Sequence, residues 1–182
     1  LDHNKKPILE RGNILLFASM HSDDRNVVLS HAMRYIEKNK NLQIVWVSHE
    51  PSNQENKYLE SIFIRRNISV SVIDSIENFN DNESRVIIIN IVGALAKLYW
   101  KVKVAYIGGG FSTGVHNLME PSVAGVPTIF GPNYNKFDEA FEILNNKSGF
   151  CIKKGSEFIE RLDELLNNDQ KLLLTSAAAK DL

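Results

Sequence analysis

The sequence predicts an α/β fold, a Rossmann-like parallel sheet with helices on both faces. Short apolar runs alternate with segments of helical period along the chain, an order typical of parallel strands joined by crossover helices. Several runs are rich in Val, Ile and Leu with little polar alternation, which favours strands buried on both faces. Because such crossovers are right-handed, the elements should form one Rossmann-like layer.

The expected elements cover most of the chain. Strands are predicted at 13–19, 43–49, 70–73, 86–90, 102–108, 127–130 and 149–153. Helices are predicted at 23–38, 53–66, 93–101, 116–124, 137–146 and 156–167. In the first helix, Val27, Ala32 and Tyr35 fall on one face, as expected for a helix that packs on a sheet. The 182 residues suit a single domain, predicted over 1–182.

Composition excludes several classes of function. The formal net charge of −1 gives no general attraction to nucleic acid or to an anionic membrane. No run of about 18 apolar residues is present, so no membrane span is expected. The single Cys151 excludes an internal disulfide and is expected to be a small buried hydrophobic residue at the start of a late strand. His-x-x-x-His, Asp-x-Asp and Cys clusters are absent from the sequence, so neither a metal nor another cofactor is expected.

The strongest motif is a glycine-rich segment, 106–121, that follows a predicted buried strand. Gly109, Gly110 and Gly114 would let the backbone approach a ligand closely, and the N-terminus of the next helix would favour a phosphate. The spacing differs from the dinucleotide fingerprint, which argues against a nicotinamide cofactor as the ligand. From the glycines alone, a tight turn without a ligand is an equally good interpretation.

Three polar side chains in or after this segment are candidate ligand contacts. Glu120 could accept hydrogen bonds from two ribose hydroxyls, or it could only offset the helix dipole. Asn117 could bind the ligand or order the loop, and His116 could contact the ligand or only pack in the loop.

Residues that end other strands should meet the glycine-rich segment, because Rossmann-like sheets bind ligands outside the carboxyl ends of their strands. Ser19, His49 and Gly93 are the candidates, and each could instead be an ordinary strand or helix end. Ser22 or Asp23 is expected to cap the helix after the first strand, with the neighbouring acidic residues offsetting its dipole.

The same segment carries a family resemblance. Gly109-Gly110 followed by Gly114-Val115-His116-Asn117-Leu118-Met119-Glu120-Pro121 resembles the Gly-Gly…Gly-His-Asn-Pro-Leu-Glu-Pro signature of 3-deoxy-manno-octulosonic acid (Kdo) transferases. Segments 18–21, 47–51, 90–95 and 124–137 are also similar to that family, in the same order. The chain departs from the family pattern at Ser48, Ala94 and Leu118, where the family has Arg, Glu and Pro.

The resemblance implies the C-terminal, donor-binding half of a two-domain GT-B glycosyltransferase, with an N-terminal acceptor domain outside this chain. The implied reaction transfers Kdo from CMP-Kdo to a lipid A precursor in lipopolysaccharide biosynthesis, without a metal. The full-length enzyme would lie peripherally at the cytoplasmic face of the bacterial inner membrane. The general base would lie in the other half, so no catalytic residue is assigned here. The expected CMP-Kdo contacts are Ser19, His49, Gly93, Gly109, Gly110, Gly114, His116, Asn117 and Glu120.

Two alternatives stay open at this point. One is a UDP-sugar-dependent GT-B enzyme, an epimerase or a peptidoglycan glycosyltransferase, since those also carry glycines and a late Glu. The other is a non-catalytic flavodoxin-like binding module. Preference for CMP over UMP and UDP would separate the first alternative from the Kdo transferase interpretation.

Overall fold

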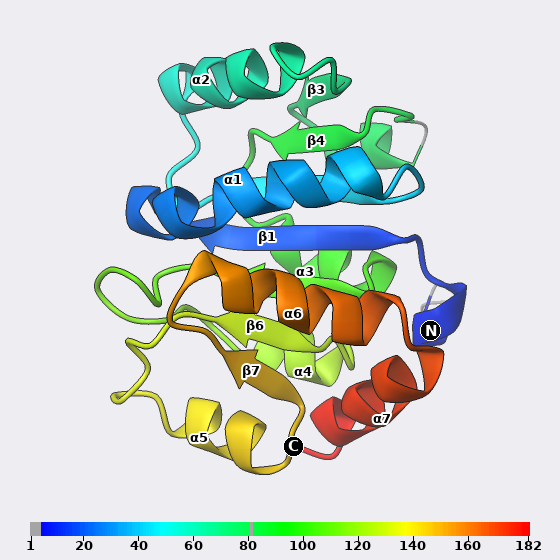
Figure 1. Ribbon diagram of the computed structural model, residues 1–182, viewed down its shortest axis with the longest axis vertical. Helices are drawn as coiled ribbons and strands as arrows, with labels where there is room; N and C mark the ends of the chain where they lie inside the picture. Colours follow the sequence, from blue (N-terminus) through cyan, green and yellow to red (C-terminus); the bar gives the residue numbers. More distant parts are fainter. Residues whose placement is uncertain (1–4, 81) are drawn as a thin grey trace.

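A computed structural model describes residues 5–80 and 82–182, and it confirms the predicted α/β class (Figure 1). All strand pairs are parallel, in the order β3-β4-β2-β1-β5-β6-β7. The strands are β1 (Ile14–Met20), β2 (Gln43–Ser48), β3 (Val70–Ile73), β4 (Val86–Ile89), β5 (Val104–Ile107), β6 (Thr128–Phe130) and β7 (Gly149–Cys151). The α-helices are α1 (Ser22–Lys38), α2 (Asn53–Ile64), α3 (Leu95–Leu98), α4 (Met119–Val123), α5 (Asp138–Asn145), α6 (Gly155–Leu166) and α7 (Asp169–Lys180). Short 3₁₀ helices are η1 (Ile8–Glu10), η2 (Ile76–Phe79) and η3 (Tyr99–Lys101).

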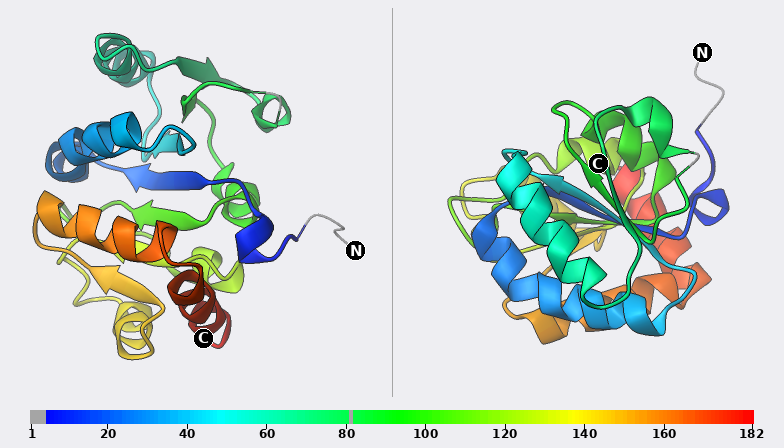
Figure 2. Two further views of the ribbon diagram at one scale, coloured as in Figure 1. Left: turned by 45° about the vertical axis from the view of Figure 1, so that its right-hand side comes forward. Right: turned by 90° about the horizontal axis from the view of Figure 1, so that it is seen from above.

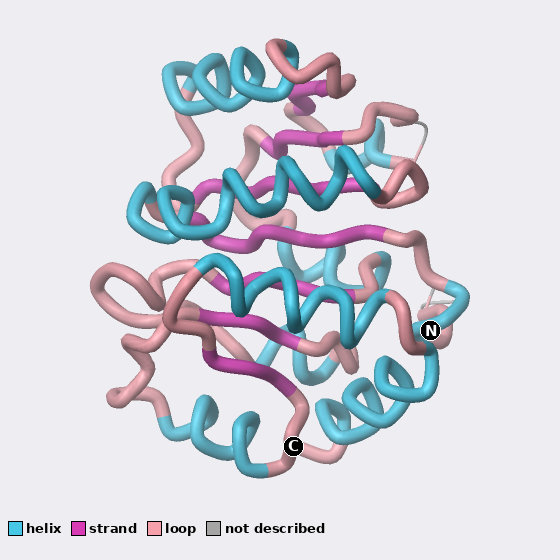
Figure 3. The backbone as a smooth tube through the Cα atoms, in the orientation of Figure 1, coloured by secondary structure: helices cyan, strands magenta, loops and turns pink. Residues whose placement is uncertain are grey.

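The order of the strands reverses at the centre of the sheet. Outward from β1, the strands β2, β4 and β3 lie on one side and β5, β6 and β7 lie on the other, and the chain crosses from one side to the other between β4 and β5. The strands of this sheet are the magenta segments in Figure 3. Strands β1 and β5 are paired from Leu15–Val104 to Ala18–Ile107. Ligands of open α/β sheets bind outside the carboxyl ends of the strands at such a switch point, which here lies between β1 and β5.

One face of the sheet is covered by α1, α2 and α6 (Figure 2). Its centre is an aromatic cluster in which Phe17 lies 4.7 Å from Trp46, 5.9 Å from Tyr106 and 5.8 Å from Phe158, measured between ring centroids. All four side chains are fully buried. Three belong to the neighbouring strands β1, β2 and β5 and the fourth to α6, so this packing fixes the helix over the switch point.

The opposite face is covered by α3, α4 and α5. Alternate strand residues supply its core, including Leu16, Val45, Ile107 and Phe130, all with about 1% or less of their surface exposed. Burial on both faces accounts for the continuous apolar runs in the sequence, because each successive side chain enters one of two cores.

Helix α7 was missed by the sequence prediction, which placed no element after residue 167. Asn168 caps it by accepting a hydrogen bond from the Lys171 N–H at 2.9 Å, and Leu172 and Ala179 are buried. The helix packs on η1, α4 and α6 rather than on the sheet. Its run of alanines gives only a weak amphipathic pattern, which is why periodicity did not reveal it.

Three other local predictions were wrong. The expected helix 93–101 divides into α3 and η3. Neither Ser22 nor Asp23 caps α1, because the N-cap residue is His21 and its side chain makes no capping hydrogen bond. Cys151 ends β7 rather than beginning a strand, and it is half-buried, with burial raising the pKa of its thiol. In the described ranges 5–80 and 82–182, no helix has the length and apolar character needed to cross a membrane.

Candidate nucleotide-sugar site at the switch point

The carboxyl ends of β1 and β5 are locked together. Ser19 adopts a left-handed backbone with φ of 52°, and the β1–β2 pairing shifts register between Phe17 and Met20. A Cβ on Gly108 would lie 2.1 Å from the Ser19 carbonyl oxygen, far closer than any side chain can approach backbone. Gly108 is therefore required for the two chain segments to pass each other at this point.

The glycine-rich loop folds back on itself before α4 begins. The Gly114 N–H donates to the Gly109 carbonyl at 3.0 Å, and both residues have positive φ, 140° and 89°. A Cβ on Gly110 would lie 2.5 Å from the Gly131 nitrogen, so the loop also packs tightly on the end of β6. These glycines serve a tight turn, as one of the two interpretations of the sequence expected. The helix does not follow directly, since α4 starts at Met119 rather than at 116 as predicted.

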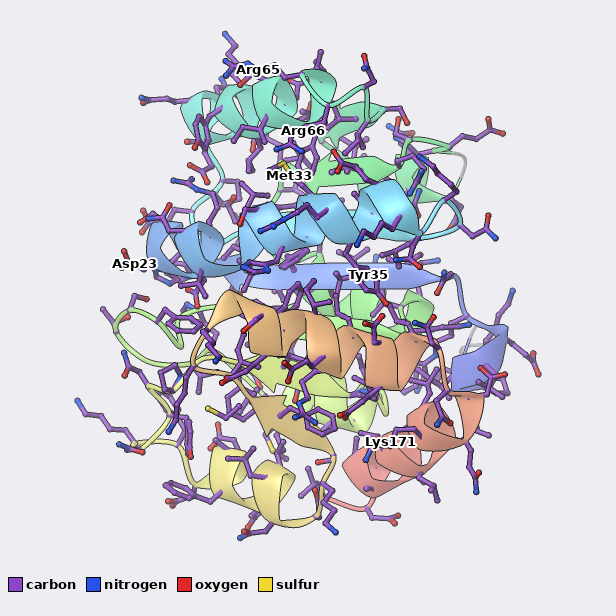
Figure 4. The ribbon with its side chains drawn as sticks, in the orientation of Figure 1. Asp23, Met33, Tyr35, Arg65, Arg66 and Lys171 are labelled. Atoms are coloured by element: carbon purple, nitrogen blue, oxygen red, sulfur yellow. The ribbon has the colours of Figure 1, made fainter. Side chains whose placement is uncertain are left out.

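Asp24 holds this loop and was missed as a site residue. Its carboxylate is fully buried and accepts hydrogen bonds from the Tyr106 hydroxyl at 3.0 Å and from the N–H groups of Gly109 at 2.7 Å and Phe111 at 3.2 Å. Burial raises the pKa of Tyr106, and the neighbouring carboxylate raises it further. The sequence suggested only charge compensation at a helix start for the Asp23-Asp24 pair, and Asp23 does lie exposed at that end of α1 (Figure 4).

The Asp24 contacts change the expected role of the loop. The N–H groups of Gly109 and Phe111 already have a carboxylate acceptor, so they are not free to meet a ligand phosphate. Among the described residues, the N–H groups of Gly110, Asn117 and Leu118 make no hydrogen bond. The sequence offered no signal for this role of Asp24, because two of its three partners are backbone N–H groups.

Three histidines converge at the same edge from three different loops. His21 precedes α1, His49 follows β2, and His116 lies in the glycine-rich loop. Their rings are stacked, with centroids 4.4–4.9 Å apart, and the Nε2 atoms of His21 and His116 are 2.7 Å apart. Backbone hydrogen bonds set this arrangement: the His49 N–H donates to Met20 O and the His116 N–H donates to Gly108 O, each at 3.0 Å. We call these three residues the histidine cluster.

The two neighbouring rings disfavour a positive charge on His116. The pKa of His116 is lowered from its ordinary value of 6.5, chiefly by burial and then by the nearby His49 and His21, while Asp24 opposes the shift. A 2.7 Å contact between two ring nitrogens needs one N–H and one lone pair, so His21 and His116 share it only if at least one ring is neutral.

Two hollows flank the histidine cluster. One, of about 300 Å³, is lined by Met20, His21, Ser22, Ser48, His49, Glu50 and Glu55. The other, of about 320 Å³, is lined by Ser19, Val47, Ser48, His49, Pro51, Ile91, Val92, Gly93, Leu95, Ala96 and Glu120. Their volumes are at the lower end of the range for small-molecule sites. His49 and Ser48 border both, so the end of β2 divides the edge into two compartments.

Glu120 and Asn117 form one polar unit at the start of α4. The Asn117 amide donates to Glu120 Oε1 at 3.1 Å, and its carbonyl accepts from the N–H groups of Met119 and Glu120 at 2.9 and 3.3 Å. The Asn117 side chain therefore orders the end of the loop before α4 and orients Glu120, although the N-cap position itself is Leu118. The other Glu120 carboxylate oxygen, Oε2, makes no hydrogen bond within the described part of the chain.

The predicted site residues do not all lie in one place. Ser19, His49, Gly93 and Glu120 line the second hollow together, although 101 residues separate the first from the last. Gly109, Gly110 and Gly114 shape the loop and are absent from the hollow's lining, whereas His116 joins the histidine cluster.

The departures from the family pattern also lie at this edge. Ser48 is buried, borders both hollows, and its hydroxyl has no hydrogen-bond partner in the described ranges. Ala94 is buried immediately before α3, so the carboxylate of the family pattern is missing there.

Known proteins resemble the chain in both sequence and fold. A 3-deoxy-D-manno-octulosonic acid transferase of Chlamydophila psittaci is 31% identical over 82% of this chain, and one of Aquifex aeolicus is 32% identical over 89%. The chain spans only 34% and 44% of the length of these two relatives. No protein-family model matches it. The C-terminal CMP-Kdo binding domain of WaaA from Acinetobacter baumannii has a TM-score of 0.79 at 20% identity, with 95% of this chain and 90% of that chain covered.

A further solved structure supports the architecture. WaaG, a glycosyltransferase involved in lipopolysaccharide biosynthesis, has a TM-score of 0.61 at 12% identity over 94% of this chain and 42% of that chain. With the reversed strand order and the hollow at the switch point, this fold defines the class as a Rossmann-like α/β domain of the kind found in these two structures. Within that class, the chain belongs to the 3-deoxy-D-manno-octulosonic acid transferase family and corresponds to its C-terminal domain. The resemblance stated from the glycine-rich segment is confirmed.

Proposed function

We propose that this chain is the donor-binding domain of a glycosyltransferase that transfers Kdo from CMP-Kdo to a lipid A precursor. The observation that carries the proposal is the convergence of Ser19, His49, Gly93 and Glu120 on one hollow at the switch point, in a chain whose relatives bear the name Kdo transferase. The name of the WaaA domain from Acinetobacter baumannii, a CMP-Kdo binding domain, supports the choice of donor.

In this proposal Glu120 holds the cytidine ribose. Its Oε1 is oriented by Asn117, and its second carboxylate oxygen faces no partner among the described residues, so it can accept hydrogen bonds from ribose hydroxyls. The exposed Gly93 borders the same hollow without a side chain, and a Cβ built there meets nothing within 4 Å, which leaves room for a base or sugar.

The phosphate of the leaving CMP would meet N–H groups that are free of Asp24. These are the N–H groups of Gly110, Asn117 and Leu118. Fixed donors of this kind stabilise charge as it develops on a leaving group, so the transfer step is proposed to need no metal. Relative to the sequence interpretation, the phosphate contact moves from Gly109 toward the residues just before α4.

The remaining parts of the reaction are assigned to the rest of the protein. The general base that deprotonates the acceptor hydroxyl, and the surface that binds the lipid A precursor, would belong to an N-terminal half. The whole enzyme would act peripherally at the cytoplasmic face of the inner membrane. This chain alone should bind CMP weakly and transfer nothing, and Kdo transfer by the isolated chain would refute that division of labour.

Calorimetric titration in EDTA tests the donor assignment. The chain should bind CMP more tightly than UMP or UDP, and Glu120→Gln should weaken CMP binding by about 1–3 kcal/mol, the usual loss for hydrogen bonds to a charged group. Glu50→Gln is the matched control, because Glu50 is exposed and borders the other hollow. A preference for UDP would replace the Kdo donor with a UDP-sugar, and equal effects of the two variants would remove Glu120 from the site.

A further inference from the structure

The histidine cluster has a geometry that the donor site does not require. His21, His49 and His116 come from three loops, and each can offer one ring nitrogen so that the three atoms lie within 4.8 Å of one another. His21 and His116 are half-buried and His49 is exposed, so the group is anchored on one side and open to solvent on the other.

The cluster has ring nitrogens whose lone pairs a metal ion could use. The contact between Nε2 of His21 and Nε2 of His116 requires a lone pair on one ring. Within the described ranges, the ring of His49 makes no hydrogen bond, so its nitrogens are not committed to another residue.

We propose that His21, His49 and His116 form a binding site for one divalent transition-metal ion, of which zinc is the best fit. Three imidazole nitrogens with a fourth, open position match the ligand set of zinc sites that keep one coordination position for water or an outside oxygen. Magnesium and calcium are disfavoured, because they take oxygen ligands. The nearest buried carboxylate, Asp24, is already bonded to three donors of the glycine-rich loop.

To admit the ion, the three rings, whose planes lie within 12–22° of parallel, would have to turn so that their nitrogen lone pairs converge. Zinc–nitrogen bonds of about 2.0–2.1 Å at tetrahedral angles place ligand nitrogens roughly 3.3 Å apart. The Nε2 atoms of His21 and His116 are 2.7 Å apart, so the ion would replace the hydrogen bond between them while the rings separate slightly. The backbone hydrogen bonds that hold His49 and His116 need not change, since they involve main-chain atoms.

The site goes beyond the proposed function, which assigns no metal to the transfer step. Zinc binding is therefore tested without nucleotide, and CMP binding is tested separately in EDTA. Loss of either binding leaves the other measurable, so the two proposals fail independently.

The experiment is calorimetric titration of EDTA-stripped, dialysed protein with zinc chloride. One ion per chain is expected, and His21→Ala, His49→Ala and His116→Ala should each weaken binding by about 100-fold, the upper end of what loss of supporting contacts costs a metal site. His31→Ala, which removes a histidine on α1 outside the cluster, should leave the affinity unchanged. Cys151→Ser serves as the control for binding through the thiol.

Cobalt substitution gives a second readout. A tetrahedral cobalt spectrum without a thiolate charge-transfer band is expected, and it should disappear in His49→Ala, whose side chain is exposed and whose loss should leave the fold intact. No zinc binding, or binding that the three cluster variants leave unchanged, would overturn the proposal. So would binding of inorganic phosphate that depends on the cluster when zinc binding does not, which would identify an anion site instead.

Discussion

Replacing Asp24 by Asn tests whether a buried carboxylate holds the glycine-rich loop. One carboxylate oxygen accepts from the Tyr106 hydroxyl and the Phe111 N–H, and the other accepts from the Gly109 N–H. An asparagine of the same shape offers only one acceptor oxygen. If that oxygen faces Tyr106 and Phe111, the NH₂ group points at the Gly109 N–H, and two donors oppose each other in a dry environment.

The magnitude follows from those three contacts. Losing one hydrogen bond to a charged group costs about 1.5–3 kcal/mol. The two surviving bonds become neutral and roughly half as strong, which adds about 1–2 kcal/mol. A total of about 2.5–5 kcal/mol is a large share of the 5–15 kcal/mol by which a domain is usually stable, and it corresponds to a fall in Tm of roughly 10 °C.

Urea and thermal unfolding of the two variants Asp24→Asn and Asp23→Asn would measure this. Asp23 is the exposed neighbour on the same turn, and its replacement should change the free energy of unfolding by less than about 0.5 kcal/mol. In a double-mutant cycle, Asp24→Asn and Tyr106→Phe should be coupled by more than about 0.5 kcal/mol, because their side chains share a hydrogen bond. A loss below about 1 kcal/mol for Asp24→Asn, or additive single effects, would refute the role given to this carboxylate.

Three further predictions address the same sheet edge and the core beside it. Gly108→Ala should prevent stable folding, because its Cβ would lie 2.1 Å from a backbone oxygen, whereas Gly93→Ala should cost only about 1–2 kcal/mol for its positive φ. Soluble yield and unfolding curves of the two variants test this, and a stable Gly108→Ala variant would contradict the packing. Tyr35→Phe should cost about 1.5–3 kcal/mol, because it removes the 2.9 Å hydrogen bond from the hydroxyl of Tyr35 (labelled in Figure 4) on α1 to Asp163 on α6. A double-mutant cycle with Asp163→Asn, measured by urea unfolding, should show coupling, and additive effects would exclude that bond. His116 has a folded-state pKa below 6.5, so metal-free protein should lose stability as pH falls below 6.5, and His116→Gln should reduce that loss; an NMR titration showing an unshifted or raised pKa would contradict this.

The sheet could be predicted from the sequence because burial on both faces leaves a direct trace. Val86–Ile89, for example, is apolar at every position and proved to be an interior strand, β4, between β3 and β2. Helix α7 left no such trace, since it packs on other helices through Leu172 and small residues rather than through a regular apolar stripe. Helix boundaries depended on local hydrogen bonds, as the start of α4 on Asn117 illustrates.

The site was predictable where its residues end strands, and it was not where side chains meet across loops. Ser19, His49 and Gly93 were placed at one edge by the rule for parallel sheets, and the structure brings them to one hollow. The histidine cluster joins positions separated by 28 and 67 residues, at 21, 49 and 116, so a search for local metal-ligand spacing could not find it. Asp24 was overlooked because two of its three hydrogen-bond partners are backbone N–H groups, and such groups leave no pattern in an amino-acid sequence.

The backbone lock between Ser19 and Gly108 divides the site into a part that cannot vary and a part that can. On the β5 side, main chain touches main chain, so substitutions there would disturb the fold before they altered a ligand. On the β2–β4 side, the hollow is bordered by exposed positions such as Val92, with 90% of its surface free, and by Gly93, where added atoms meet empty space. Substitutions that adapt the site to a new donor sugar would therefore accumulate on the β2–β4 side of the hollow. This chain already departs from the family pattern there: Ser48 borders the hollow, and Ala94 lies beside it, immediately before α3.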